Sequence, residues 1–241
     1  MPTRRSFLSA GPLGLLSGRT IAAAEPPQRV LVTGGHPDDP ETGCGGTLAA
    51  LAEAGVETHV MYLTRGEAGI EGKPPAEAAR IRTAEAEAAC RILGAVPHFA
   101  GQTDGAAEVT PAAYDAVQAI VDAIRPDTVL THWPIDTHRD HRICSLLTYD
   151  AWLRVVPEAR LLYYEVMTGT QTQTFSPTLF LDITAAEPTK RRACEAHTSQ
   201  NLAAEYDGTE RTIAQFRGRQ SGHELAEAFV PHATGAAAAA W

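Results

Sequence analysis

An apolar run that stops abruptly in a polar loop constrains this chain more than any other feature. Residues 30–34, Val-Leu-Val-Thr-Gly, are typical of a buried strand, and the glycine and proline that follow force a turn. The turn holds His36, Asp38, Asp39 and Glu41. Open α/β sheets bind ligands outside the carboxyl ends of their strands, so chemistry is expected here. His36 and Asp39 suit a first-row metal and Asp38 suits a base, although Pro-Asp-Asp is also ordinary in a solvated turn.

A second apolar run, residues 128–131, is followed by a second polar cluster. This cluster contains His138 and His141, which lie three residues apart and share a face in a first helical turn. A His-x-x-His pair alone is a weak motif. Its position after a predicted strand strengthens it, because a parallel sheet brings the ends of its strands together. The two clusters therefore predict one site at the carboxyl edge of a sheet.

Longer motifs surround both clusters. Residues 36–47 read His-Pro-Asp-Asp-Pro-Glu-Thr-Gly-Cys-Gly-Gly-Thr, and residues 138–141 read His-Arg-Asp-His. Together they resemble the PIG-L/LmbE-like family of zinc-dependent N-acetylglucosaminyl deacetylases. The combination is specific for the family and not for a substrate. Further matching segments are Leu63–Gly69, Arg82-x-x-Glu85 with Leu93-Gly94 after it, and Lys190–Gln200.

The length of the chain after its first 25 residues fits one α/β domain, residues 26–241. The resemblance implies a Rossmann-like three-layer sandwich with a mostly parallel sheet and an active site at the carboxyl ends of its strands. Hydrophobic periodicity and breaker residues place the elements. Strands are expected at 30–34, 56–64, 96–100, 128–131, 160–166 and 178–183, and helices at 43–55, 75–93, 111–124, 188–200 and 210–219, with one more continuing after 143 to about 155.

The resemblance also implies a metal centre with one zinc ion per chain. It assigns the zinc ligands to His36, Asp39 and His141, and the general base to Asp38. Catalytic zinc takes three protein ligands, keeps a position open for water and lowers the pKa of that water to about 7. The division of roles between the two adjacent aspartates follows from the resemblance and not from their spacing.

Other residues are expected around the metal. His138, if protonated, would stabilise the oxyanion, and Asp140 would orient His138 and favour its charged form. The resemblance makes Arg82 and Asp104 substrate contacts. Arg65 follows a predicted strand and would line the pocket beside them. The alternatives are an exposed ion pair for Arg82, an Asp-Gly turn for Asp104 and a plain surface loop for Arg65.

Two residues remain open at this stage. Pro40 moves the acidic Glu41 one place along from the shorter form of the motif, so a helix-end or supporting role for Glu41 is as reasonable as a substrate contact. His197 would either enter the site or pack structurally.

Composition excludes several classes of partner. The net charge of −9 and the lack of a long basic run argue against nucleic acid or an anionic membrane as the main partner. Gly-Gly-His-Pro does not match a dinucleotide fingerprint.

The four cysteines lie far apart, which argues against a zinc-thiolate site and leaves a single disulfide possible. The sequence does not determine whether the chain forms homo-oligomers.

The start of the chain reads as a targeting segment. Arg4 and Arg5 precede a modestly apolar stretch, and small residues at 22–24 offer a cleavage site. We expect residues 1–25 to be a twin-arginine export signal, with the mature protein periplasmic or extracellular. A basic tail is the alternative. The apolar part is too short and too interrupted to span a bilayer, so no integral membrane segment is expected.

The expected reaction is hydrolysis of an N-acyl group, most simply N-acetyl, on an amino sugar or its conjugate. One alternative is another metal-dependent amidase or a phosphoesterase, which would gather more carboxylates around two metals. A second is an exported carbohydrate-binding protein without turnover, which would not need the spare aspartate. Export favours extracellular or cell-wall sugars over a cytosolic substrate.

Overall fold

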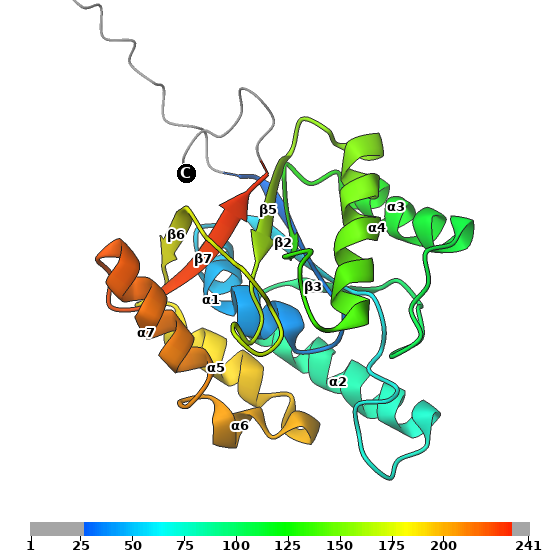
Figure 1. Ribbon diagram of the computed structural model, residues 1–241, viewed down its shortest axis with the longest axis horizontal. Helices are drawn as coiled ribbons and strands as arrows, with labels where there is room; N and C mark the ends of the chain where they lie inside the picture. Colours follow the sequence, from blue (N-terminus) through cyan, green and yellow to red (C-terminus); the bar gives the residue numbers. More distant parts are fainter. Residues whose placement is uncertain (1–26, 233–241) are drawn as a thin grey trace, which may run out of the picture.

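A seven-stranded sheet forms the middle layer of the molecule (Figure 1). The computed structural model describes residues 27–232. The strands are β1 (Arg29–Gly34), β2 (Glu57–Tyr62), β3 (Val96–Phe99), β4 (Thr128–His132), β5 (Arg160–Tyr164), β6 (Leu179–Asp182) and β7 (Ala226–Pro231). They lie in the order β3-β2-β1-β4-β5-β7-β6. The first five are parallel, and β7 runs antiparallel to both of its neighbours.

Helices cover both faces of the sheet (Figure 1). Side chains alternate along β1, so Val30 and Val32 pack in one apolar cluster and Leu31 packs in another. The first cluster includes α1 (Asp39–Glu53), α2 (Pro75–Leu93) and α5 (Glu187–Glu195). The second includes α3 (Pro111–Ile124) and α4 (Arg139–Val155). The short α6 (Leu202–Glu205) and α7 (Glu210–Ser221) follow α5 in the chain.

The predicted α/β fold, a Rossmann-like three-layer sandwich with a mostly parallel sheet, is confirmed. The strand order reverses between β1 and β4, because the chain first adds β2 and β3 on one side and then returns to the other side of β1. Such a reversal opens a crevice outside the carboxyl ends of the two strands. Both polar clusters leave from these ends, since His36 follows β1 and His138 follows β4.

The helix after β1 begins earlier than predicted. We expected a helix over residues 43–55, opened by a glycine turn, whereas α1 begins at Asp39. Pro40 lies in its first turn, where a helix makes no use of the missing N–H. The proline ring contacts Gly34 so closely that a Cβ at Gly34 would collide with it. As a result, Asp39 stands in the first helical turn and Asp38 directly before it.

Strand β7 was not predicted. Its sequence, Ala-Glu-Ala-Phe-Val-Pro, has weak strand propensity and ends in proline. Tertiary contacts hold it in the sheet. The buried Glu227 accepts the backbone N–H groups of Gly46 and Thr47 at 2.9 and 2.7 Å, and Lys190 Nζ lies 2.7 Å from the same carboxylate. This pairing ties the last strand to α1 and α5.

One further helix differs clearly from its prediction. The helix expected over residues 188–200 ends at Glu195, and a 3₁₀ turn (Thr198–Gln200) follows it. Helix α4 starts at Arg139 with His138 as its cap, as the His-x-x-His spacing predicted. The helices expected over residues 75–93 and 111–124 have the predicted bounds.

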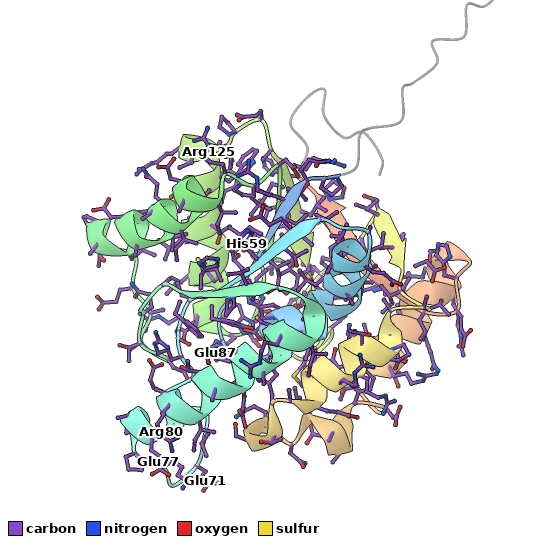
Figure 2. All side chains as sticks on the ribbon, turned by 180° about the vertical axis from the view of Figure 1, so that it is seen from behind. His59, Glu71, Glu77, Arg80, Glu87 and Arg125 are labelled. Carbon is purple, nitrogen blue, oxygen red and sulfur yellow. The ribbon has the colours of Figure 1, made fainter. Side chains whose placement is uncertain are left out.

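Helix α2 presents two different faces. Arg82 and Glu85 are buried against the body of the molecule, whereas Arg80 and Glu87 are exposed. Figure 2 shows Arg80 and Glu87 on the outer side of the helix, seen from behind. The residues of the Arg82-x-x-Glu85 motif therefore face inward, and the predicted alternative of an exposed ion pair is wrong.

The remaining predictions concern thiols and termini. Cys44, Cys90, Cys144 and Cys194 are all buried and free, so the disulfide left open by the sequence is not formed. Within residues 27–232, no helix is long and apolar enough to cross a bilayer. The expected export signal at residues 1–25 and the alanine-rich tail at residues 236–240 lie outside the described residues.

Candidate active site

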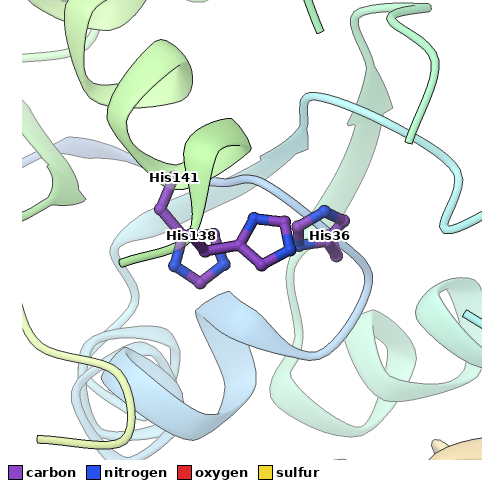
Figure 3. Close-up of side chains that lie close together, drawn as sticks. All are labelled: His36, His138 and His141. Carbon is purple, nitrogen blue, oxygen red and sulfur yellow. The ribbon is translucent and has the colours of Figure 1, made fainter. Parts of the chain in front are cut away.

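Three histidine rings meet at the switch point of the sheet (Figure 3). His36 lies in the loop after β1, and His138 and His141 lie at the start of α4. The ring centroid of His138 is 4.6 Å from those of both His36 and His141, and the His36 and His141 centroids are 5.3 Å apart. All three line a cavity of about 470 Å³. The two predicted clusters therefore form one site.

Asp39 lies against two of these rings and against a fourth histidine, His132. Its Oδ2 is 3.3 Å from His36 Nδ1, 3.3 Å from His141 Nε2 and 3.4 Å from His132 Nε2. Burial raises the pKa of Asp39, but the charges and hydrogen bonds of His141 and His132 outweigh burial and hold it well below its ordinary value. The carboxylate is thus ionised and faces several imidazole nitrogens.

This donor set fits a zinc ion. Imidazole nitrogens and a carboxylate oxygen are ordinary zinc ligands, and the predicted ligands His36 and His141 both lie against Asp39 Oδ2. Burial lowers the pKa of His141, but Asp39 and Asp136 raise it to about 9. Without a metal ion, His141 therefore holds a proton, and this positive charge balances the carboxylates as a bound metal cation would. Within residues 27–232, the groups of three with ligand atoms within 4.8 Å of one another are His36-His138-His141, Asp39-His132-His141 and His36-Asp104-Asp140. The predicted ligands His36, Asp39 and His141 are divided among these groups and do not form one of them.

The sequence interpretation missed two residues of this cluster. Asp136 Oδ1 lies 3.3 Å from His141 Nδ1, on the side of the ring away from Asp39. Such a carboxylate fixes the orientation of a metal-binding imidazole. His132, at the end of β4, accepts the Gly35 N–H at its Nε2. A signal for Asp136 was present, because a carboxylate next to a His-x-x-His pair is an expected partner for one of its rings.

Asp38 stands apart from the histidine cluster, on the wall of the cavity. Its φ of 120° is unusual for a residue with a side chain. The guanidinium of Arg82 holds the strained loop: its Nη2 donates to Asp38 Oδ2 at 2.8 Å and also to the Pro37 carbonyl. Burial raises the pKa of Asp38 to about 6, and the Arg82 charge opposes that rise. Arg82 thus fixes the position of the Asp38 carboxylate, the predicted base.

The Leu63–Gly69 motif makes room for this arginine. A Cβ at either Gly66 or Gly69 would collide with the Arg82 guanidinium. Arg82 lines the cavity but is only 3% exposed. The structure thus gives Arg82 a positioning role through Asp38, and the predicted substrate contact remains a prediction.

We expect Arg82→Met to lower turnover by about tenfold to hundredfold, because Asp38, the predicted base, loses the group that holds it in place. Removing the guanidinium charge raises the pKa of Asp38, so the acid limb of the kcat/KM profile should move to higher pH. The metal content should not change. Arg80→Met, on the exposed face of the same helix, is the matched control. An unshifted acid limb would contradict the coupling between Arg82 and Asp38.

Two further predicted residues face His36. Asp104 Oδ1 lies 3.1 Å from His36 Nε2, and Asp140 Oδ2 lies 3.3 Å from the same nitrogen. The Asp104 carboxylate also accepts the Ala68 N–H at 3.0 Å, and the Asp140 carboxylate accepts the Gly105 N–H at 2.7 Å. Asp104 also lines the cavity, where the predicted substrate contact remains available to it.

The predicted role of Asp140 toward His138 needs correction. In the described part of the chain, the Asp140 carboxylate makes no hydrogen bond to the His138 ring. Instead, His138 Nδ1 accepts the backbone N–H of Asp140, because α4 begins at this point. Burial and the neighbouring His36 and His141 lower the pKa of His138, and they outweigh the Asp39 and Asp140 carboxylates, which favour its charged form as predicted for Asp140. The structure therefore favours a neutral His138 that carries its proton on Nε2.

The predicted pocket contact of Arg65 is also wrong. Its Nη1 donates to Thr83 Oγ1 at 3.0 Å, and its guanidinium lies 4.2 Å from the centroid of the Phe99 ring. Arg65 lines a separate groove on the outside of α2, together with Arg80 and Glu87. Stacking on an aromatic ring and a hydroxyl acceptor draw the side chain away from the cavity.

Glu41 and His197 lie behind the site and do not line the cavity. Both side chains are completely buried, and His197 Nε2 is 3.4 Å from Glu41 Oε1. Tyr62 donates its hydroxyl to the same oxygen. Burial lowers the pKa of His197, but Glu41 and Asp38 raise it above the ordinary value. This pair joins the first turn of α1 to the segment after α5, which is the structural role left open by the sequence.

The remaining cavity wall comes from the second half of the chain. Glu85 of α2 clamps the 3₁₀ turn in place, because its carboxylate accepts Thr198 Oγ1 at 2.8 Å, Ser199 N at 2.8 Å and Ser199 Oγ at 2.7 Å. Gln200 then reaches the Gly69 carbonyl at 3.1 Å. The wall residues supplied beyond β5 are Val166, Met167, Gln171, Gln200, Leu202, Glu205 and Glu210.

Comparison with known proteins agrees with this geometry. The family described as PIG-L, GlcNAc-PI de-N-acetylase, matches residues 31–152. A diacetylchitobiose deacetylase from Thermococcus kodakarensis is 30% identical over 223 residues, which cover 85% of this chain and 84% of that protein. The chain belongs to the PIG-L family. The expectation of a PIG-L/LmbE-like hydrolase of the N-deacetylase class is thereby confirmed.

Solved structures place the PIG-L fold over most of the chain. The N,N'-diacetylchitobiose deacetylase from Pyrococcus horikoshii has a TM-score of 0.77 and 25% identity, and the match covers 88% of each chain. GalB, the 4-carboxy-2-hydroxymuconate hydratase from Pseudomonas putida KT2440, also has a TM-score of 0.77, with 24% identity over 86% of this chain and 97% of that one. At that identity, the likeness to GalB shows the fold alone.

Proposed function

We propose that this protein is a zinc-dependent hydrolase that removes an N-acetyl group from an amino sugar or its conjugate. One observation carries the proposal: Asp39 lies among imidazole nitrogens, while the adjacent Asp38 is held outside that cluster on the cavity wall by Arg82. A binding protein would have no use for a second, separately oriented carboxylate. The names of the deacetylase relatives support the same reaction.

His36, Asp39 and His141 are the residues that would hold the zinc ion. When bound there, zinc would supply a Lewis acid that polarises the amide carbonyl and makes water nucleophilic at neutral pH. Asp38 takes the proton of the attacking water and delivers it to the leaving nitrogen as the amide C–N bond breaks. The products are acetate and the free amine.

His138 is placed to stabilise the charge that develops on the carbonyl oxygen. Its Nδ1 accepts the Asp140 N–H, so its proton is on Nε2, which belongs to a ring that lines the cavity. A neutral imidazole that donates from Nε2 performs the oxyanion role without the protonation that the sequence interpretation assumed. Asp136 and Asp140 act on the rings of His141 and His36 rather than on the substrate.

The size of the cavity supports a small sugar substrate. Its volume of about 470 Å³ lies in the range of pockets that enclose small ligands, about 300–1,000 Å³. The T. kodakarensis and P. horikoshii relatives are named for diacetylchitobiose, a disaccharide. We therefore propose N-acetylated mono- and disaccharides as the first substrates to test.

Acetate release from these sugars is the deciding measurement. Zinc-loaded protein should release acetate, chelator-treated protein should not, and added zinc should restore the activity. The control is the chelator-treated sample incubated with magnesium, which prefers all-oxygen sites. A zinc-loaded protein that binds the sugars and releases no acetate would instead support the binding-protein alternative.

One observation keeps a second candidate open. The His36-Asp104-Asp140 group has donor atoms within 4.8 Å of one another and shares His36 with the proposed zinc ligands. Two adjacent metals would suit a phosphoesterase. Metal analysis distinguishes the two: about one zinc per chain supports the deacetylase, and two metals with phosphate release from phosphate esters would support the second candidate.

We further propose that the protein is exported by the twin-arginine route, from the arginine pair before an apolar stretch. Replacing Arg4 and Arg5 by Lys should leave the protein inside the cell, with its amino-terminal segment uncleaved. Unchanged export of that double variant, measured by cell fractionation, would contradict the proposal.

A further inference from the structure

Glu210, the first residue of α7, is buried and lacks a partner. It is 6% exposed, yet it lines both the active-site cavity and a smaller cavity of about 20 Å³, which has room for a single water. Within residues 27–232, the Glu210 carboxylate makes no hydrogen bond and no ion pair. A carboxylate that gives up this much water normally gains a donor in return, and Glu210 has none from the described residues.

The neighbouring charges do not supply that donor. Lys190 Nζ is bonded to Glu227 at 2.7 Å, and the Arg217 guanidinium is bonded to Glu165 through two hydrogen bonds of 2.6 Å each. Each cation thus has its own carboxylate, and Glu210 is the additional one. Burial raises the pKa of Glu210 to about 7, and Lys190 opposes that rise.

The wall of the active-site cavity likewise has more carboxylates than Lys or Arg side chains. Apart from the proposed metal ligand Asp39, the acidic residues of this wall are Asp38, Asp104, Glu205 and Glu210. Arg82 is the one Arg or Lys side chain of this lining, and its guanidinium is bonded to Asp38. An anionic group on a substrate would find no free cation along the described wall away from the metal.

We propose that Glu210 forms a cation-selective subsite that binds an ammonium group on the non-reacting part of the substrate. This inference rests on the proposed function, in which the other part of the sugar reaches the zinc centre. The ligand class that fits is an amino-sugar oligomer with one free amine and one remaining N-acetyl group. The ammonium would enter the small cavity or donate to Glu210 from the larger one.

The test compares two matched substrates and one product. The substrates are N,N'-diacetylchitobiose and chitobiose with a single N-acetyl group, and the product is fully deacetylated chitobiose. Glu210→Gln keeps the shape of the side chain and removes its charge. We expect this variant to lose about tenfold in kcat/KM on the monoacetylated substrate relative to the diacetylated one, since a charge-assisted hydrogen bond is lost. Binding of the product, measured by calorimetry, should weaken by a similar factor.

Glu205→Gln is the matched control, because it removes an identical charge from an exposed position on the same wall. It should leave the preference between the two substrates unchanged. Glu210→Asp retains the charge and should keep part of the preference. Equal melting temperatures of the three variants and the original protein exclude a folding defect as the cause.

Failure of this inference and failure of the proposed function give different results. Acetate release with the same preference in Glu210→Gln as in the original protein would overturn the subsite and leave the deacetylase standing. No acetate release from either substrate, with product binding weakened by Glu210→Gln alone, would overturn the deacetylase and support the subsite. Equal loss of product binding in Glu205→Gln and Glu210→Gln would reduce the effect to general charge and overturn the subsite.

Discussion

Asp38→Asn should retain zinc and lose about a hundredfold to ten-thousandfold in turnover, which is the contribution of a positioned general base. Asparagine has the same shape as aspartate and can still accept the hydrogen bond from Arg82. It also tolerates positive φ better than most residues, so the φ of 120° at this position should persist. The substitution therefore removes the base and little else.

The measurement pairs zinc content by mass spectrometry with acetate release. Asp122→Asn on the exposed end of α3 is a control for the loss of one carboxylate. An Asp38→Asn protein that keeps its full turnover would mean that another group takes the proton. In that case, Asp104 and Asp140, which both face His36, become the residues to examine.

Asp39→Ala is expected to lose both zinc and activity. Its Oδ2 lies against His36, His132 and His141, and it accepts the His36 backbone N–H at 2.7 Å. Removing this carboxylate takes away one proposed ligand and the contact that shapes the loop after β1. Zinc content should fall to near zero at micromolar total metal, whereas Asp38→Asn stays loaded.

The contrast between the two variants is the informative result. If Asp38→Asn and Asp39→Ala lose zinc equally, the division of roles between the adjacent aspartates is wrong. Asp39→Asn provides a check on folding, since it keeps an oxygen for the His36 N–H and removes the charge. We expect it to bind zinc more weakly than the original protein and to melt at a similar temperature.

The family resemblance implied the fold, and the meeting point of the site could be predicted because it depends on local patterns. Buried strands ended in polar loops, and the strand order of such a sheet brings the ends of β1 and β4 together. Asp39, His36 and His141 lie next to these ends, and the family resemblance assigned them as zinc ligands. The histidine spacing likewise predicted the first turn of α4.

The sequence interpretation failed where a side chain chooses between distant partners. Arg65 and Arg82 both looked suited to a pocket, yet Phe99 and Thr83 draw the first outward and Asp38 holds the second inward. Asp140 turns to Gly105 because α4 begins beside it. Strand β7 forms against its weak propensity through the buried carboxylate of Glu227. Such choices depend on contacts between residues far apart in the chain.

The clamp that Glu85 makes on the 3₁₀ turn has a consequence for how the protein can change. The proposed zinc ligands and the base come from the loops after β1 and β4, whereas much of the opposite wall comes from residues beyond β5. Three hydrogen bonds to Thr198 and Ser199 fix the position of that wall without using any residue of the metal cluster. Substitutions in the carboxyl-terminal third can therefore change the substrate specificity during evolution, while the proposed zinc ligands and base stay the same.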